Sequence, residues 1–274
     1  MSEEKAVADA SALNAKLIYE VIRREGEEEL ERPASSLIWS GIAAGILISF
    51  SVFGEAVLRI NLPDTGTSYL IENLGYSFGF LLVILGRMQL FTENTITTIM
   101  PLMARRTVSA LMSTLRLWGI VLAANVVGAT CAAAFMVYTS ILGPELTTAV
   151  GDLSRHATGF GATEGFVRAI PAGILVAAIV WMLPGLISGE VLLIVLFTWL
   201  IAAGDFTHVI AGSVEMWFLI FEGELGGTAA IFGFFLPVLA GNIVGGTAVF
   251  TLLAWGQVKN EVDPPESPEP FDVP

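Results

Sequence analysis

Long apolar segments are the feature that most limits what this chain can fold into. Residues 37–58, 117–142, 169–188 and 228–255 are each long enough for a helix that crosses a bilayer, which needs about 20 mostly apolar residues. Charged residues make up only 14% of the chain, against about 25% in a typical soluble domain. The sequence therefore predicts an all-α membrane protein and excludes a disordered chain, a fibrous protein or an ordinary cytosolic enzyme.

Two further apolar segments are too short to cross a bilayer. Residues 73–86 and 191–203 are each followed by a polar stretch and a second apolar piece, residues 95–104 and 209–221. Irregular backbone at membrane depth survives only where protein or water satisfies its N–H and C=O groups. We therefore predict six spans, of which the second and the fifth are broken.

The two halves of the chain carry similar motifs in the same order. QLFTENTITTIM (89–100) aligns with GDFTHVIAGSVEM (204–216) through their Phe-Thr pairs, at an offset of 115 residues. AANVVGA (123–129) aligns with AGNIVGG (240–246) through Asn125 and Asn242, at an offset of 117 residues.

Each half, about residues 37–142 and 165–256, holds three spans, an odd number. The second half must then enter the membrane upside down relative to the first, which makes an inverted repeat. Interrupted segments at matching positions of two inverted halves are typical of a transport site for a small solute.

His208 is the leading candidate for chemistry, and it lies in the second break beside Thr207. Histidine can exchange a proton near neutral pH, and an ionisable group at membrane depth usually serves a function. The alternative is a histidine that only caps the broken helix.

Thr92, Glu93 and Asn94 occupy the first break. Hydroxyl and amide groups there could replace part of an ion's water shell. For Glu93 the expected partner is Arg87, six residues earlier and predicted at membrane depth, or else His208. An ion pair with Arg87 that holds the break is preferred over direct contact between Glu93 and the solute.

The bulky neighbours Leu90, Phe91 and Phe206 could form an apolar constriction that excludes water, or they could simply fill the core. Asn242 could brace the break or line the path.

Other motifs leave one alternative function. GYSFG (75–79) fits the GxSxG pattern, so an intramembrane serine protease that uses Ser77 and His208 stays open, although it gives no reason for the repeat. No zinc ligand set, Walker motif or basic face is present in the sequence, and we expect no cofactor, metal or nucleic-acid partner.

The two ends of the chain have a different composition. Residues 1–32 predict a cytoplasmic tail with an amphipathic helix over 7–30, which lies on the membrane surface or packs on a neighbour. Residues 258–274 are acidic and Pro-rich, and we expect them to be disordered. With both termini in the cytoplasm, the inner side carries nine Lys and Arg residues and the outer side three, as the positive-inside rule requires.

Taken together, these motifs resemble the formate/nitrite transporter family over about residues 30–257. The similar segments are LFTENT in the first break, GDFTHVIAGS in the second, and the paired ANVVGA and GNIVGG. The resemblance implies an aquaporin-like protomer of six helices, assembled as a homopentamer in the bacterial inner membrane with one pore per subunit. It also implies passage of small monovalent anions such as formate or nitrite.

The resemblance further implies roles for individual residues. His208 would be the central histidine that donates a proton to the anion, and Thr92 the polar contact of the first break. Leu90 and Phe91 would fall at a constriction, and Asn242 would be the asparagine of the sixth span.

Three acidic residues depart from the family pattern. Glu190 stands where family members usually carry a lysine, Glu93 replaces a small or neutral residue, and Asp205 lies near the histidine. Negative charges near the path should repel an anion. An altered selectivity, for a neutral or cationic solute on the same fold, is therefore the alternative prediction.

Overall fold

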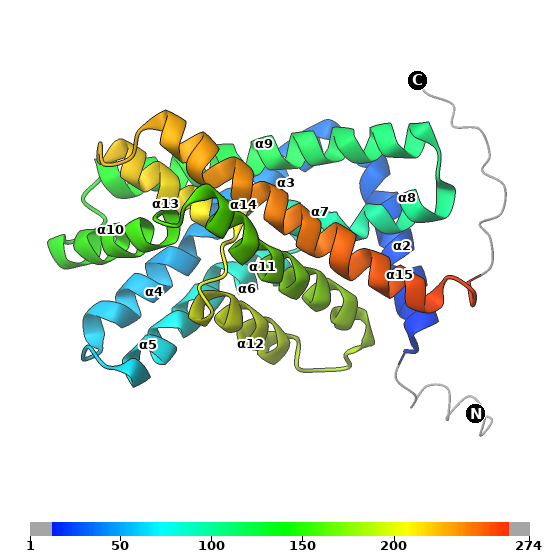
Figure 1. Cartoon of the computed structure of the whole chain (residues 1–274), viewed down its shortest axis with the longest axis horizontal. Coiled ribbons are helices and arrows are strands. Elements are labelled where there is room, and N and C mark those ends of the chain that lie inside the picture. The colour runs from blue at the N-terminus through cyan, green and yellow to red at the C-terminus, as the bar shows by residue number, and fades with distance from the viewer. Residues whose placement is uncertain (1–12, 263–274) are drawn as a thin grey trace.

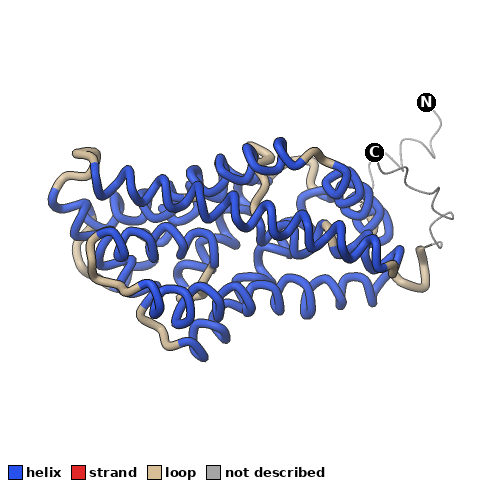
Figure 2. Tube along the Cα trace, turned by 90° about the horizontal axis from the view of Figure 1, so that it is seen from above, coloured by secondary structure: helices blue, strands red, loops and turns tan. Residues whose placement is uncertain are grey.

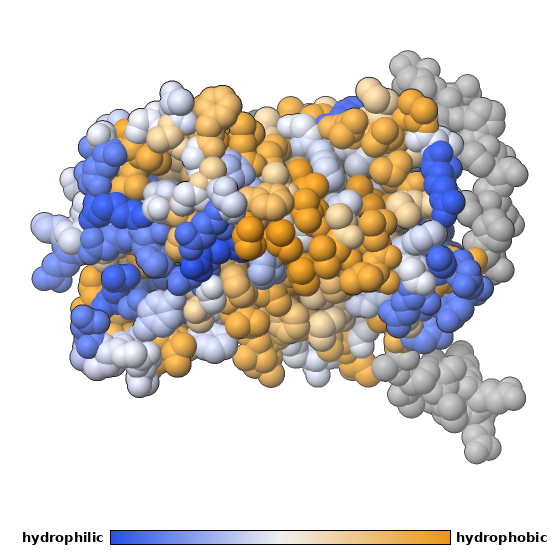
Figure 3. Space-filling model, viewed as in Figure 1, coloured by the Kyte–Doolittle hydropathy of each residue, from blue (hydrophilic) through white to orange (hydrophobic). Residues whose placement is uncertain are grey.

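The computed structural model describes residues 13–262, and within that range every regular element is helical (Figure 2). The first six residues of the helix predicted over 7–30 and most of the C-terminal tail lie outside the described residues. Polar residues gather at both ends of the elongated molecule, and apolar residues form a broad band between them (Figure 3). That pattern suits a protein whose long axis crosses a bilayer.

The first half of the chain contains two long spans around an interrupted one (Figure 1). Its elements are α2 (Ala15–Glu31), α3 (Ala34–Leu47), α4 (Ser49–Asn61), α5 (Gly66–Glu72), a 3₁₀ turn (Asn73–Tyr76), α6 (Ser77–Leu85), α7 (Phe91–Thr97), α8 (Ile99–Arg105) and α9 (Val108–Tyr138).

The second half repeats this arrangement after a helix that belongs to neither repeat, α10 (Pro144–Thr158). Its elements are α11 (Ala162–Met182), a 3₁₀ turn (Leu183–Gly185), α12 (Glu190–Ala203), α13 (Val209–Phe221), a π-helix (Ala229–Phe235), α14 (Leu236–Ile243), a second π-helix (Val244–Thr251) and α15 (Leu252–Val258).

The six predicted apolar segments form helices, but the expectation that the first piece of the second span is too short to cross a bilayer was wrong. Among the described residues, five continuous helices are long and apolar enough to cross a membrane: 34–61, 66–85, 108–138, 162–185 and 229–258. The fifth span in chain order consists of two shorter apolar helices, α12 and α13. The first piece of the second span begins at Gly66 rather than at residue 73, because the polar helix α5 continues through the 3₁₀ turn into α6.

Each half contains a glycine at an equivalent contact between two of its own helices. A Cβ on Gly45 would overlap the carbonyl oxygen of Asn125, and one on Gly173 would overlap the carbonyl oxygen of Asn242. The backbones of α3 and α9 therefore touch, and so do those of α11 and α14. Small residues permit such close approach between helices in a membrane.

Helix α2 packs across the end of the bundle opposite α10 (Figure 1). Its Tyr19 and Ile22 are buried in a cluster with Ile96, Met100 and Val258. Of the two interpretations of this amphipathic helix, the structure supports packing on neighbouring helices. The two ends of the molecule are called the α2 end and the α10 end below.

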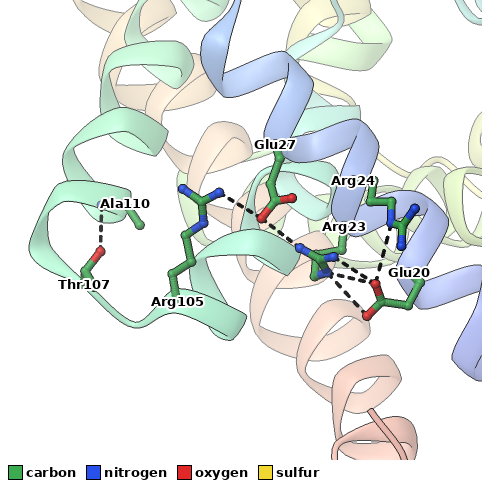
Figure 4. Close-up of polar contacts among 7 residues, drawn as sticks. All are labelled: Glu20, Arg23, Arg24, Glu27, Arg105, Thr107 and Ala110. Carbon is green, nitrogen blue, oxygen red and sulfur yellow. Dashed lines mark hydrogen bonds and ion pairs between the residues drawn. The ribbon is translucent and has the colours of Figure 1, made fainter. Parts of the chain in front are cut away.

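Ion pairs add to this contact at the α2 end. The Glu27 carboxylate lies between Arg23, at 2.8 Å, and Arg105 of α8, at 3.0 Å (Figure 4). Arg23 also pairs with Glu20 on its own helix at 2.9 Å. Pairs that are partly exposed contribute only about 0–1 kcal/mol each, so the buried apolar side chains supply most of the attachment.

The close approach at Gly173 leads to a stability prediction. Gly173→Ala should lower the free energy of unfolding by about 1–3 kcal/mol, because its methyl group has no room beside Asn242. Gly119→Ala on α9 is the matched control: nothing lies within 4 Å of the added atom, and alanine favours a helix by up to about 1 kcal/mol. Thermal unfolding of the detergent-solubilised protein distinguishes the two variants. Equal unfolding temperatures would contradict the proposed contact.

Candidate functional site

Each broken span changes direction at the same type of turn. After α6, Arg87 adopts a left-handed backbone with φ 50°. The N–H of Met88 donates to the Val83 carbonyl at 3.0 Å, and that of Arg87 donates to the Ile84 carbonyl at 3.1 Å. This is the Schellman motif, which satisfies the last carbonyls of a helix and usually places glycine at the left-handed position.

The turn after α12 repeats this geometry. Asp205 has φ 53°, the N–H of Phe206 donates to Ile201 at 2.9 Å, and that of Asp205 donates to Ala202 at 3.0 Å. The two left-handed residues lie 118 positions apart. Both breaks are therefore ordered turns, in which the ends of α6 and α12 have hydrogen-bond partners.

Asn125 holds the backbone of the first break. Its Oδ1 accepts the Phe91 N–H at 2.9 Å, at the start of α7. Its Nδ2 donates to the carbonyls of Gln89 and Gly41, both at 2.8 Å. The asparagine thus satisfies one orphan donor and one orphan acceptor of the break and ties both to α3.

Asn242 does the same for the second break. Its Oδ1 accepts the Val209 N–H at 2.8 Å, and its Nδ2 donates to the carbonyls of Ala169, at 2.8 Å, and Thr207, at 3.0 Å. Asn242 is fully buried. Of the two roles considered for it, the structure shows the bracing contacts.

These contacts correct the alignment of the two halves. Asn125 binds Phe91 and Asn242 binds Val209, so Phe91 corresponds to Val209, and Leu90 to His208. The predicted match between Phe91-Thr92 and Phe206-Thr207 was wrong by three positions. The false match arose because each half contains a Phe-Thr pair near its break. The correct offset of 118 residues is given by Gly86 and Gly204, which directly precede the two left-handed residues.

The two breaks meet at His208 and Thr92. The Nε2 of His208 lies 2.8 Å from the Thr92 hydroxyl, and its Nδ1 accepts the Ala211 N–H at 3.3 Å as the N-cap of α13. Since Nδ1 accepts, we assign the ring proton to Nε2, which donates to Thr92. The rings of Phe80 and His208 form a T-shaped pair with their centroids 5.1 Å apart. His208 is therefore both a helix cap and a hydrogen-bond donor at the centre of the molecule.

The residues next to Thr92 and His208 in the chain are buried as well. Leu90 and Phe91 are each 1% exposed, and Phe91 packs edge-on against Trp118 at 5.5 Å. Thr207 is buried, and its hydroxyl donates to the Gly165 carbonyl at 2.9 Å.

On the α10 side lies a cavity of about 560 Å³, called the vestibule below. It extends from α5 and α10 down to Phe206, Thr207 and His208. Besides His208, its charged or basic lining residues are Glu55, Arg59, Asp64, Glu72, His156, Asp205 and Glu215, and its aromatic ones include Tyr69, Tyr76, Phe160 and Phe234. The volume falls within the range of small-molecule sites.

Sequence reasoning did not assign Glu55 or Glu215 to the site. Glu215 stands alone among apolar residues in VIAGSVEMWFLIF, the sequence of α13. An acidic residue inside an apolar membrane segment is a signal that could have identified it.

Several predicted partnerships are wrong. The Arg87 side chain is 87% exposed and lies 3.9 Å from Glu25 of α2, so it is neither buried at membrane depth nor paired with Glu93. Burial raises the pKa of the Glu25 carboxyl, and Arg87 opposes that shift. The Glu93 Oε1 is buried without a hydrogen-bond partner among the described residues, and His208 contacts Thr92 instead.

The two other acidic candidates lie apart from each other. The Asp205 carboxylate contacts His156 Nε2 at 2.8 Å and the Tyr69 hydroxyl at 3.2 Å, so Asp205 belongs to the vestibule. Glu190 is the first residue of α12 and does not line the vestibule.

The serine protease alternative finds no support in the geometry. The hydroxyl of Ser77 is fully buried, donates to the Val195 carbonyl at 3.2 Å and accepts from Thr198 at 2.8 Å. Because His208 Nε2 is engaged with Thr92, the two residues form no Ser–His dyad.

The family model described as formate/nitrite transporter matches residues 16–256. The chain belongs to the formate/nitrite transporter family. The family resemblance found in the motifs is thereby confirmed.

Two relatives illustrate the range of similarity. The chain is 43% identical over 248 residues to the inner membrane protein YfdC of Escherichia coli (strain K12), covering 90% of this chain and 80% of YfdC. It is 29% identical over 247 residues to the uncharacterized transporter YrhG of Bacillus subtilis (strain 168), covering 87% and 90%.

Solved structures of the family share the fold. A pentameric formate channel with formate bound aligns with a TM-score of 0.71 at 23% identity, covering 83% of this chain and 98% of that one. An FNT family ion channel aligns with a TM-score of 0.75 at 20% identity, covering 89% and 98%. The predicted aquaporin-like architecture of two inverted three-helix repeats with broken second and fifth helices is confirmed.

The asparagine contacts predict a specific loss of stability. Asn242→Ala should lower the free energy of unfolding by at least about 2 kcal/mol, because it leaves buried backbone groups at Val209 and Thr207 unpaired. The control is Thr130→Ala on α9, whose hydroxyl bonds only to its own helix, at Val126. Thermal unfolding of both variants in detergent tests this expectation, and an Asn242→Ala protein as stable as the control would contradict the bracing role.

The left-handed turn predicts an unusual order of substitutions at Arg87. Arg87→Gly should be more stable than Arg87→Val, since a β-branched residue is strained at φ 50° and glycine is not. Arg24 supplies the control, because it lies inside helix α2 and its side chain is 73% exposed. There the order should reverse, with valine more stable than glycine. The same order of stability at both positions would show that the turn does not govern the effect.

Proposed function

We propose that this protein is a channel or proton-coupled carrier for a small monovalent anion of the formate and nitrite class, or for its neutral acid. The observation that carries the proposal is the 2.8 Å contact between His208 and Thr92 at the floor of the vestibule. This contact joins the two broken spans. This arrangement and the family match support transport rather than catalysis.

His208 and Thr92 would bind the solute as hydrogen-bond donors. A small anion that enters from the vestibule can accept from Nε2–H of His208 in place of Thr92, while the Thr92 hydroxyl turns to donate as well. Hydrogen bonds to a charged group contribute about 1.5–3 kcal/mol each. They would offset part of the large cost of removing the anion from water.

The apolar side chains beyond this contact favour the neutral form of the solute. Leu90 and Phe91 offer an anion no hydrogen bond from their side chains. A solute that takes up a proton at His208 crosses this region at lower cost. A histidine that donates a full proton must first become imidazolium, which removes the acceptor on Nδ1 and breaks the cap bond to Ala211.

The proposal extends to the oligomeric state and to the orientation of the protein in the membrane. We infer a homopentamer with one pore per subunit in the bacterial inner membrane, as supported by the fold shared with a pentameric formate channel. The α2 end, with Arg105 and Lys259, is the cytoplasmic one, because short loops rich in Lys and Arg stay inside. In this orientation the vestibule opens outward, and both termini lie in the cytoplasm.

A second candidate is the same pathway with altered selectivity for a neutral or cationic solute. It is favoured by one observation: Glu55 and Glu215 line the vestibule without forming an ion pair among the described residues. Ion-replacement currents distinguish the two candidates. If the pathway conducts anions, the reversal potential of the current should change with the formate gradient. If it conducts cations, the reversal potential should change with the gradient of the counter-ion.

The flux assay for the proposed function uses proteoliposomes loaded with labelled formate, nitrite or acetate. Flux should increase as the pH falls, because the neutral acid becomes more abundant. Thr92→Val should reduce it by about 10-fold or more, the kinetic equivalent of one lost hydrogen bond to a charged group. His208→Asn keeps an N-cap residue for α13 and should reduce the flux to a similar degree.

Thr130→Val is the matched control for Thr92→Val, since it removes a half-buried hydroxyl away from the path. It should transport at the rate of the unmodified protein. Intact oligomers that carry none of the three solutes would refute the proposal.

A further inference from the structure

The vestibule has an excess of acidic side chains at its inner wall. Glu72 pairs with Arg59 at 3.7 Å, and Asp205 pairs with His156 at 2.8 Å. Glu55 on α4 and Glu215 on α13 line the same cavity, and neither forms an ion pair or a side-chain hydrogen bond with any residue that the structure describes. Arg59 and His156 are thus engaged by two of the other three acids of the vestibule, and Asp64 is the third.

Glu215 makes this imbalance costly. It is 8% exposed, it lines the vestibule, and it belongs to an otherwise apolar helix, α13. A carboxylate that is nine-tenths buried needs a partner of opposite charge or several hydrogen-bond donors. The described residues supply neither, so Glu215 is neutralised either by a proton or by a cation from outside the chain.

The surroundings of Glu215 indicate which kind of cation fits. Glu55, Tyr76 and Glu215 all line the same cavity. Tyr69, Phe206 and Phe234 add aromatic surface to the same cavity. Carboxylates combined with the faces of aromatic rings are the groups that attract ammonium ions.

The geometry favours an organic cation over a bare metal ion. Among the described residues, no cluster of three His, Cys, Asp or Glu side chains has the arrangement of a metal site. The cavity of about 560 Å³ is far larger than a coordination shell, and a small ligand with an apolar body would fill it better.

We propose that the inner wall of the vestibule binds a small alkylammonium ion between the carboxylates of Glu215 and Glu55, with Tyr76 beside its charge. This site goes beyond the anion path proposed above, because its ligand has the opposite charge and does not require passage through the His208–Thr92 contact. A bound cation would also neutralise the wall that an incoming anion has to pass.

Isothermal titration of the full-length protein in lipid nanodiscs tests the site, with ethylammonium and tetramethylammonium chloride as probes near neutral pH. Both should bind with one site per chain, since the second probe offers a charge without N–H donors. Glu215→Gln should weaken binding by about 10-fold or more, the equivalent of one lost charged contact. Glu145→Gln, which removes an exposed charge on α10 at the same end, should leave binding unchanged.

If Glu215→Gln fails to assemble, Glu55→Gln provides an independent test of the site. This variant should weaken ammonium binding to a similar degree. Equal binding of ethylammonium to the unmodified protein and to the Gln variant would overturn the site. So would equal competition by sodium chloride, which would show that any cation screens a pair of carboxyls.

Formate flux measured on the same preparations separates this site from the proposed function. Flux without ammonium binding would refute the site and leave the anion path standing. Ammonium binding without flux of any tested anion would support the site and refute the anion path.

Discussion

Broken helices inside a bilayer require every freed backbone group to find a partner, and the rest of this structure depends on that requirement. Two buried asparagines meet it, Asn125 for the first break and Asn242 for the second, with three hydrogen bonds each. Once the breaks are fixed, the first turns of α7 and α13 meet at the centre, and Thr92 and His208 come within hydrogen-bond distance. The central contact is a consequence of how the backbone is satisfied.

Apolar length and the repeated motifs were sufficient to predict most of the fold. The spans, the two breaks and the inverted repeat follow from segment length, from odd span number and from the two asparagines at matching positions. These features can be read from single segments of the sequence, because the thickness of the bilayer sets the same minimum length for every span. The start of the second span was missed, since the polar residues of α5 do not resemble a membrane segment although they continue the helix.

The site was predictable in its centre but not in its partnerships. His208 and Thr92 were identified from their place in the breaks, and the structure brings them together. Arg87 and Glu93 are close in sequence, yet a left-handed turn directs Arg87 toward α2 and leaves Glu93 inside the bundle. The vestibule could not be predicted from the sequence, because Glu55, Glu72 and Glu215 come from three different helices. Only their three-dimensional arrangement reveals which carboxylates have partners.

The two Schellman turns place opposite charges at equivalent positions of the repeat. Arg87 reaches α2 at one end of the molecule, and Asp205 faces the vestibule at the other. The two ends of the proposed pathway are therefore related in backbone but differ in electrostatic potential, so a charged solute should be captured at different rates from the two sides. A passive pore cannot convert this difference into net pumping, because detailed balance fixes the equilibrium. It can rectify, carrying solute faster in one direction than in the other under equal and opposite gradients.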